Sequence, residues 1–231
     1  MDILLISGHG AGDPGATATI DGAKYEEAIE ARVITQKVKM ELSKYANVTL
    51  YPTDRNAYGD YKNGVLRSTA NFGKYDYVLE IHFNACVNDT RGNGKTTGTE
   101  CYVTTSESGV SVETAILNNI AKLGFKNRGV KKQNFAVINT AKNAGVSSAL
   151  LEVCFIDDAD DMRLYINKRD AIAKAIVDGV VSGFGLAKVE SIPDYASLVC
   201  NKAGLGDVTK TYLNQYKYAS DLWKKLWEAM S

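Results

Sequence analysis

Short apolar runs alternate with longer amphipathic stretches from the N-terminus to about residue 185. The short runs are typical of buried strands, whereas the longer stretches repeat their apolar residues with the period of an α-helix. In the stretch 24–45, Ile34, Val38, Leu42 and Tyr45 recur at spacings of four, four and three residues and form one stripe. We expect strands at 2–7, 47–51, 76–82, 99–104, 134–138 and 148–154, and helices at 24–45, 62–73, 108–123, 158–167 and 169–184.

This alternation predicts an α/β fold: a mainly parallel, mixed central sheet of about six strands, covered by helices on both faces. Two polar, glycine-rich segments, 8–23 and 85–98, interrupt the pattern and are expected to be loops. Long loops in compact domains tend to be functional, so both segments are candidates for parts of a site.

The pattern changes after residue 186. We expect a first domain at 1–186, a linker at 187–194 and a small α-helical C-terminal module at 195–231. Near the C-terminus, five residues form one apolar stripe: Leu222, Trp223, Leu226, Trp227 and Met230. Because exposed tryptophans are costly, we expect this stripe to be buried. It could dock onto the first domain or close a small core with Leu198, Leu205, Leu213 and Tyr216.

Composition narrows the possible partners. The 231 residues include 27 basic and 27 acidic side chains, so no net charge favours nucleic acid or an anionic membrane surface. No stretch approaches the ~18–20 apolar residues of a membrane span. The first seven residues have no basic leader, which predicts a strand rather than a signal peptide and a protein made in the cytoplasm. Four widely spaced cysteines exclude a cysteine-rich zinc site.

Three polar residues stand near the ends of predicted strands: His9, His82 and Glu152. The carboxyl ends of strands in an open parallel sheet are where ligands bind, and all three residues map to that edge. Separately, each has an ordinary explanation, since a core imidazole can be hydrogen-bonded and Glu152 can pair with an arginine. Together they favour a metal site, because an ionised glutamate in a buried strand is costly without a partner.

Zinc accepts imidazole nitrogens and carboxylate oxygens, and catalytic zinc sites use three protein ligands. With only two histidines in the chain, one ligand must be a carboxylate. Glu26, Glu27 and Glu30 open the first predicted helix, where some of them complement the helix dipole instead. Asp13 and Asp21 are weaker competitors in the loop that carries His9.

The chain resembles the zinc-dependent N-acetylmuramoyl-L-alanine amidases of the type-3 amidase family, in particular the catalytic domains of clostridial phage endolysins. The resemblance spans about residues 1–185 and rests on motifs that occur in order along the chain. These are Gly8-His9-Gly10, Asp13-Pro14-Gly15-Ala16, a glutamate near the start of the first helix, Arg67-Ser68-Thr69-Ala70-Asn71, Glu80-Ile81-His82-Phe83-Asn84-Ala85, Gly98-Thr99-Glu100, Asn127-Arg128-Gly129-Val130 and Ala149-Leu150-Leu151-Glu152.

This resemblance implies one zinc ion per chain, held by His9, Glu26 and His82, with Glu152 as the catalytic carboxylate. The expected reaction is hydrolysis of the peptidoglycan amide between N-acetylmuramic acid and L-alanine of the stem peptide. Glu80 has the strand parity of His82 and is a candidate partner of that ligand, or else one half of a structural ion pair. Asn84 and the loop 85–98 are candidate substrate contacts.

Other functions fit the same residues. A zinc peptidase acting on the stem peptide would need the same metal chemistry, and a sporulation or autolytic amidase would share the fold. A metal-free wall-binding module is disfavoured, because a binding module does not need Glu152 as a proton carrier. For a phage-encoded lysin we expect release to the wall through a holin, and we expect the C-terminal module to bind the bacterial cell wall.

Overall fold

The computed structural model describes residues 1–188, 194–216 and 218–230 and divides the chain into two compact units, Met1–Lys188 and Val189–Ser231. Most of the linker predicted at 187–194 lies outside the described residues.

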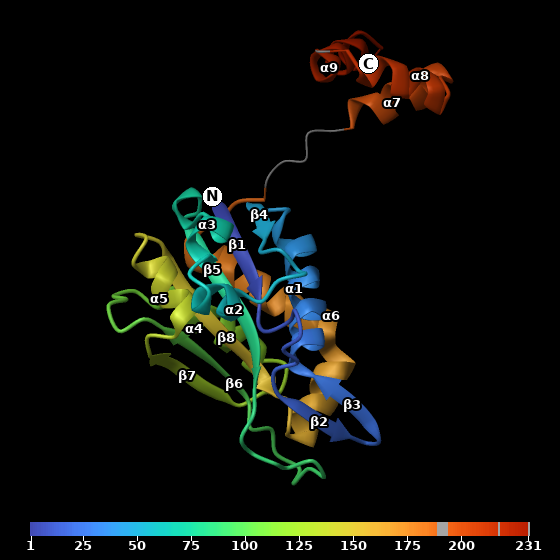
Figure 1. Ribbon diagram of the computed structural model, residues 1–231. Helices are drawn as coiled ribbons and strands as arrows, with labels where there is room; N and C mark the ends of the chain where they lie inside the picture. Colours follow the sequence, from blue (N-terminus) through green and yellow to red (C-terminus); the bar gives the residue numbers. More distant parts are fainter. Residues whose placement is uncertain (189–193, 217, 231) are drawn as a thin grey trace. The chain divides into compact units, whose positions relative to one another are not determined.

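The first unit contains a six-stranded mixed sheet in the order β4-β1-β5-β8-β6-β7 (Figure 1). The strands are β1 (Asp2–Ser7), β4 (Asn47–Leu50), β5 (Tyr77–Asn84), β6 (Thr99–Val103), β7 (Asn127–Lys132) and β8 (Ser147–Phe155). Neighbours among β4, β1, β5 and β8 are parallel, whereas β6 runs antiparallel to β8 and parallel to β7. The predicted α/β class is confirmed. The amino ends of β6 and β7 therefore lie at the edge where β1, β5 and β8 have their carboxyl ends.

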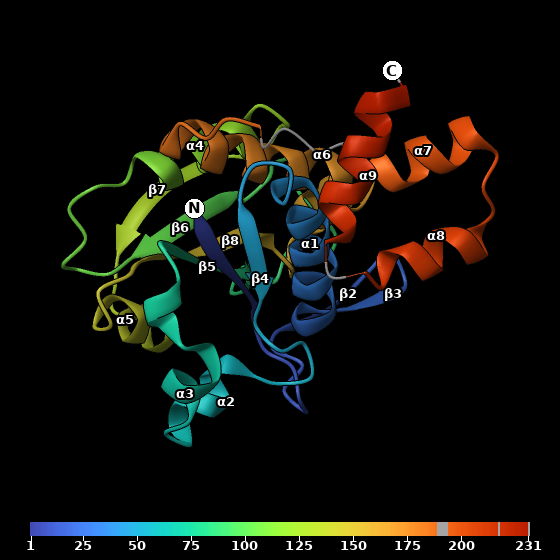
Figure 2. The same cartoon turned by 90° about the horizontal axis from the view of Figure 1, so that it is seen from above.

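Helices cover both faces of this sheet (Figure 2). Apolar residues of α1 (Glu27–Leu42), α4 (Ser111–Ala121) and α6 (Ala159–Phe184) share one core with Ile3 and Leu5 of β1. The alternate residues of β1, Leu4 and Ile6, face the other core with α2 (Ala57–Lys62), α3 (Leu66–Ala70), the 3₁₀ turn η1 (Phe72–Lys74) and α5 (Ala136–Lys142). This distribution follows from the two-residue period of a strand.

The prediction of a strand at 134–138 is wrong. These residues enter α5, where Val137, Ile138 and Ala141 are buried at helical spacing. The apolar run was too short to distinguish a strand from a buried helix. The sixth strand is β7 instead, a polar edge strand interrupted by a glycine, and such a strand has no clear hydrophobic period.

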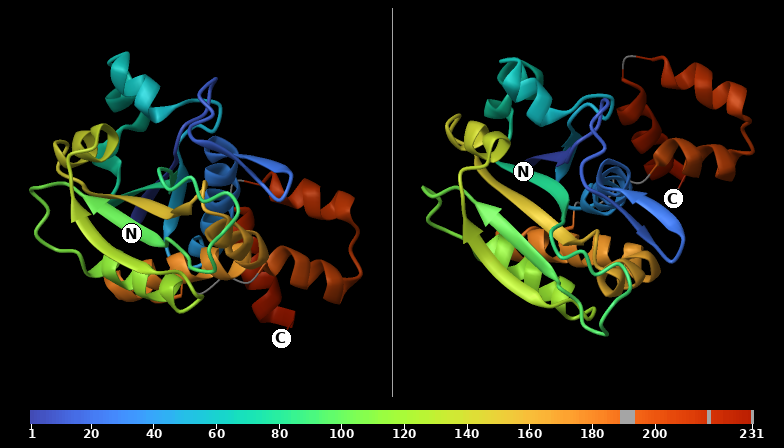
Figure 3. Two further views of the ribbon diagram at one scale, coloured as in Figure 1. Left: turned by 90° about the horizontal axis from the view of Figure 1, so that it is seen from below. Right: turned by 60° about the horizontal axis from the view of Figure 1, so that its bottom comes forward.

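A β-hairpin occupies part of the segment expected to be loop and helix. Strand β2 (Thr17–Ile20) pairs antiparallel with β3 (Ala23–Glu26), and Figure 3 shows this hairpin projecting from the unit. Asp21 and Gly22 connect the strands with φ of 52° and 81°, as a two-residue turn of type I′ requires. Helix α1 therefore begins at Glu27, three residues later than predicted.

The remaining helices differ from expectation mainly in their boundaries. The stretch predicted as one helix at 62–73 holds α3 and η1. The two helices predicted at 158–167 and 169–184 form the single helix α6, which is kinked at Lys168 (φ −128°).

The second unit contains three helices within its described residues, α7 (Tyr195–Ala203), α8 (Asp207–Asn214) and α9 (Ala219–Met230). Trp223 is 3% exposed and packs with Ala196, Val199 and Cys200. Leu213, Leu226, Trp227 and Met230 are partly buried against this small core. Leu205 and Tyr216 are 38% and 55% exposed, so the core is smaller than the sequence suggested. Within the described residues, no helix combines the length and apolar character needed to cross a membrane.

Candidate active site

The sequence-predicted residues meet at one pocket at the carboxyl edge of the sheet. His9 follows β1, His82 lies near the end of β5 and Glu152 lies opposite His82 on β8. The pocket has a volume of about 390 Å³. Its lining includes these three residues together with Ala16, Glu27, Tyr58, Glu80, Phe83, Asn84, Ala85, Phe135, Ala136, Val137 and Leu150. Polar groups therefore converge on one part of a pocket that also has apolar walls.

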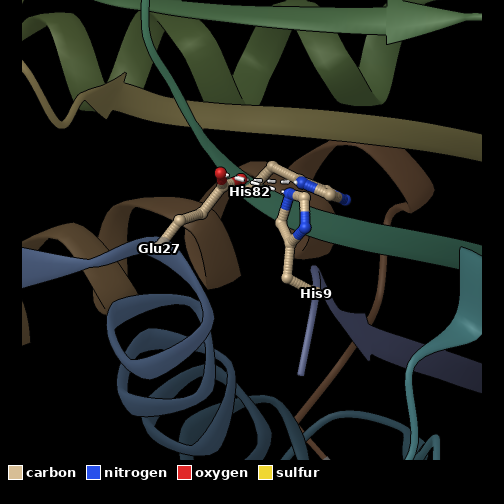
Figure 4. A group of neighbouring side chains, drawn as sticks. All are labelled: His9, Glu27 and His82. Atoms are coloured by element: carbon tan, nitrogen blue, oxygen red, sulfur yellow. Dashed lines mark hydrogen bonds and ion pairs between the residues drawn. The ribbon is translucent and has the colours of Figure 1, made fainter. Parts of the chain in front are cut away.

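The carboxylate of Glu27 contacts both histidines (Figure 4). Its Oε2 is 3.2 Å from His9 Nε2, and its Oε1 is 2.9 Å from His82 Nδ1. The imidazole rings stand nearly perpendicular, at 78°, with centroids 5.0 Å apart. One ligand atom from each of the three side chains lies within 4.8 Å of the other two. This group could hold a metal ion.

The other ring nitrogen of His9 contacts a carboxylate. Asp13 Oδ2 lies 2.9 Å from His9 Nδ1. Asp13 accepts two hydrogen bonds that hold it in place. The backbone N–H of Gly15 and the side-chain amide of Asn56 each donate to its carboxylate at a distance of 3.0 Å. A carboxylate on the second nitrogen fixes the orientation of an imidazole and leaves the first nitrogen free to bind a metal. From the sequence, Asp13 was only a weaker candidate for direct ligation.

The second ring nitrogen of His82 also lies near a carboxylate. Glu80 Oε1 lies 3.1 Å from His82 Nε2 without the alignment of a full hydrogen bond. Glu80 is therefore placed beside this histidine, on the side away from Glu27. Gly8 packs against the opposite ring edge, since a Cβ at this position would lie 2.4 Å from the imidazole. Only glycine allows the first strand to end so close to His82.

Arg32 of α1 supports the loop that carries His9. His9 has a φ of 59°, in the left-handed region that non-glycine residues seldom adopt. The Arg32 guanidinium donates hydrogen bonds to the carbonyls of His9, Ala28 and Thr53. Gly10 leaves room for this guanidinium, because a Cβ there would lie 1.6 Å from Nη2. Arg32 was not identified from the sequence, because its role arises only when the loop folds back on α1.

The three groups alter one another's protonation. Burial by itself would raise the pKa of Glu27, but hydrogen bonds with His82 and His9 outweigh it and lower that pKa strongly. Burial by itself would lower the pKa of both imidazoles. Contacts with Glu27, and for His82 also with Glu80, outweigh burial and raise both pKa values. The site therefore keeps Glu27 ionised, which is the form in which a carboxylate can bind a metal.

Glu26, the residue predicted as the third ligand, does not point toward the histidines. It ends β3, and its carboxylate pairs with Lys24 Nζ at 2.7 Å. The backbone at Glu26 is extended (φ −125°, ψ 128°), and successive side chains of an extended chain point to opposite sides. Glu27 instead turns inward, where the backbone N–H groups of Ala16 and Phe83 also donate to its carboxylate.

Glu152 is the remaining carboxylate in the pocket. Its Oε2 is buried and has no hydrogen-bond partner among the residues that the structure describes. Burial raises the pKa of Glu152 to about 8; the His82 charge opposes this shift, and the charges of Glu27, Glu100 and Glu80 add to it. A carboxyl group with a pKa near neutrality is suited to accept and return a proton.

Asn84 lies on the pocket wall at the end of β5. Its side-chain amide donates a hydrogen bond of 2.8 Å to Glu100 Oε1, and its Oδ1 accepts a hydrogen bond from the backbone N–H of Ala85. The structure thus positions Asn84 at the pocket, with its amide orientation set by a buried carboxylate.

The loop 85–98 is held at the same edge by the aspartates around the start of α6. Asp157 Oδ2 accepts hydrogen bonds from the N–H groups of Cys86, Val87 and Asn88, all within 3.0 Å. Asp160 Oδ2 accepts hydrogen bonds from three further backbone N–H groups of the loop. The segment is therefore an organised wall, although its polar sequence gave no indication of these partners.

Known proteins share this fold and sequence pattern. The endolysin of Bacillus phage SPP1 is 29% identical over 187 residues, covering 78% of this chain and 64% of that protein. The sporulation-specific N-acetylmuramoyl-L-alanine amidase of Bacillus subtilis is 25% identical over 206 residues, covering 83% and 71%. The chain thus spans less than two thirds of the phage endolysin's length.

A solved structure agrees at the level of the fold. The catalytic domain of CwlV, an N-acetylmuramoyl-L-alanine amidase from Bacillus (Paenibacillus) polymyxa var. colistinus, superimposes with a TM-score of 0.63 at 23% identity, covering 80% of this chain and 99% of that one. The family model described as N-acetylmuramoyl-L-alanine amidase matches residues 3–182, from β1 into α6. Because this match includes most of the chain and every residue of the pocket, the chain belongs to the type-3 N-acetylmuramoyl-L-alanine amidase family.

Proposed function

We propose that this chain is a zinc-dependent peptidoglycan amidase that hydrolyses the bond between N-acetylmuramic acid and L-alanine of the stem peptide. The observation that carries the proposal is the convergence of His9, Glu27 and His82 in a pocket that also contains Glu152. Family membership supports the same reaction.

The donor set fits zinc. Two imidazoles and one carboxylate form a known type of catalytic zinc site, which leaves a coordination position for water or substrate. Each imidazole directs one nitrogen toward Glu27 and the other toward a further carboxylate. This arrangement is typical of histidine ligands, whose second nitrogen is held by an outer partner. We therefore assign His9, Glu27 and His82 as the ligands of one zinc ion per chain.

Held by His9, Glu27 and His82, zinc would supply Lewis acidity that lowers the pKa of water and polarises the scissile carbonyl. The chain's own contribution to proton transfer comes from Glu152. Its carboxylate accepts a proton from the attacking water and returns it to the amine nitrogen of L-alanine as the C–N bond breaks. The products are the lactyl carboxylate and a free amine. The apolar walls at Tyr58 and Phe135 exclude bulk water from part of the bound substrate.

The decisive experiment is mass spectrometry of muropeptides released from purified peptidoglycan. We expect intact stem peptides with a free L-alanine amino group, loss of cleavage after chelation, and recovery on adding zinc. Cleavage within the stem peptide would indicate a zinc peptidase instead. Full activity in protein verified to be metal-free would reject the metal assignment.

We further propose that the helical unit from Tyr195 binds the cell wall and that the protein reaches its substrate after release from the cytoplasm. A separately folded unit can hold an enzyme near an insoluble substrate and so raise its local concentration. The separate apolar core of this unit, around Trp223, supports the idea.

A further inference from the structure

A buried carboxylate next to the pocket accepts hydrogen bonds from four side chains. Glu100 on β6 has a side chain that is 1% exposed. Its Oε1 accepts hydrogen bonds from the Asn84 amide at 2.8 Å and the Tyr102 hydroxyl at 2.7 Å. Its Oε2 accepts from Arg128 Nε and Lys131 Nζ, each at 2.5 Å. One carboxylate thus orients two cations and also the amide of Asn84, which lines the pocket.

A bulge in β7 brings the two cations together. The register between β6 and β7 shifts by one residue after Thr99, so β7 contains an extra residue around Gly129, whose φ is 83°. In a regular strand, side chains three residues apart point to opposite faces. The bulge reverses that parity, and such bulges redirect side chains in many proteins. Arg128 and Lys131 can therefore both reach Glu100.

Both cationic side chains are anchored by Glu100, but only some of their N–H donors form hydrogen bonds with the described residues. Arg128 donates through Nε and lies over the Phe155 ring, with Cζ 4.8 Å from the centroid. Within the described part of the chain, its two terminal nitrogens make no hydrogen bond. The Arg128 and Lys131 side chains are 29% and 39% exposed. Glu100 can neutralise only one of the two charges, so the cluster keeps a net positive charge at the surface.

The cluster adjoins the proposed reaction site. Asn84 contacts the same carboxylate as Arg128 and also lines the pocket, so one carboxyl group separates the cation from the pocket wall. Glu100 pairs in register with Glu152 across β6 and β8. The pocket itself contains the carboxylates of Glu27, Glu80 and Glu152. An anionic group on a substrate would avoid these carboxylates and bind on the cationic side.

We propose that Arg128 and Lys131 form a subsite for a carboxylate of the stem peptide, close to the amide that is cleaved. Glu100 acts as the positioning residue that holds both cations in place. A guanidinium whose Nε is already fixed presents its terminal nitrogens in the planar geometry that carboxylates accept. The proposal rests on the proposed function and adds a preference among stem peptides to it.

The test measures how the 231-residue, zinc-loaded protein cleaves two synthetic substrates. N-acetylmuramoyl-L-alanyl-D-glutamate and N-acetylmuramoyl-L-alanyl-D-isoglutamine differ by one carboxylate replaced with a carboxamide. We expect the wild type to have a KM about tenfold lower for the carboxylate substrate, with similar kcat, because charge-assisted hydrogen bonds are the stronger ones. Arg128→Gln and Lys131→Gln should each reduce this preference by raising KM for the carboxylate substrate only.

Two further variants separate binding from structure. Lys132→Gln is the matched control, since this neighbouring lysine instead donates to the carbonyl of Glu107; we expect the preference to be unchanged. Glu100→Gln should raise KM for the carboxylate substrate more than for the carboxamide substrate, while zinc content stays near wild type. Equal KM values for the two substrates in the wild type would overturn the subsite even if the amide is cleaved. The subsite would also be rejected if Arg128→Gln raised KM equally for both substrates. Failure to cleave purified peptidoglycan would reject the proposed function itself.

Discussion

At the scale of single residues, the choice between Glu26 and Glu27 depends on the junction of β3 and α1. We predict that Glu27→Ala loses bound zinc, because this carboxylate contacts both histidines. Glu26→Ala is the matched control and should retain zinc, since it removes only a surface ion pair with Lys24. Metal content of the purified variants measures both effects. Zinc loss in Glu26→Ala with retention in Glu27→Ala would reverse the assignment.

Glu152 should differ from the ligands. We expect Glu152→Gln to retain zinc while turnover falls ~10²–10⁴-fold, the usual contribution of a positioned acid–base group. The amide has nearly the same shape but cannot accept the water proton. Turnover on purified peptidoglycan, measured beside metal content, distinguishes the two roles. A variant that is isolated without metal would show that Glu152 is a ligand instead.

A third residue-scale prediction concerns pH. Hydrogen bonds from Arg55 and Tyr51 lower the pKa of Asp60 below its ordinary value. A carboxylate with a depressed pKa in the folded state stabilises the protein above its unfolded pKa of ~3.9, and this stabilisation is lost as pH falls through the folded pKa. Asp60→Asn should therefore lower the free energy of unfolding by about 1–3 kcal/mol at pH 7 and by progressively less below pH 4.

Urea unfolding at pH 7 and pH 3 measures this difference. Asp54→Asn provides the control, because Asp54 is exposed in the turn that precedes α2. The prediction would be contradicted if Asp60→Asn lowered the free energy of unfolding by the same amount at both pH values.

At the scale of helices and strands, the close approach of α4 and α6 depends on two glycines. A Cβ at Gly179 would lie 2.5 Å from the Ile116 Cα, and one at Gly183 would lie 2.7 Å from the Val112 Cα. These contacts involve backbone atoms, so a rotamer change cannot relieve them. We predict that Gly179→Ala destabilises the fold by ~1–3 kcal/mol, as overpacking does, although alanine favours helices.

Gly59→Ala in α2 is the control for helix propensity. The added Cβ would meet its nearest neighbour, Asn56, at an ordinary 3.6 Å. We expect this variant to be stabilised by up to ~1 kcal/mol. Chemical denaturation compares the two variants, and a stabilised Gly179→Ala protein would show that α4 and α6 can separate without cost.

At the scale of the whole molecule, the chain consists of two compact units, of which only Met1–Lys188 contains the pocket. We predict that truncation after Ala187 leaves a folded, zinc-binding hydrolase that remains active on soluble muropeptides. Its binding to intact walls and its lysis of whole cells should drop. Co-sedimentation with purified walls measures the binding. Equal wall affinity of the truncated and the 231-residue chains would exclude a targeting role for the helical unit.

Several features could be inferred without tertiary structure. Alternating apolar periods predicted the α/β class, because a strand or helix must bury one side of itself wherever it lies. The same pattern placed His9, His82 and Glu152 at strand ends, where a parallel sheet brings ligand-binding groups to a common edge. The break predicted between 167 and 169 coincides with the kink at Lys168 in α6.

Other features were decided only when distant segments packed together. The turn at Asp21 and Gly22 closes a hairpin that ends at Glu26, and this places Glu27, one residue later, between the histidines. Strand β7 has no hydrophobic period because neither of its faces is buried: its residues are half-buried or exposed. Sequence periodicity reports which side of an element is buried, whereas these contacts depend on register and on the torsions of single residues at the junctions between elements.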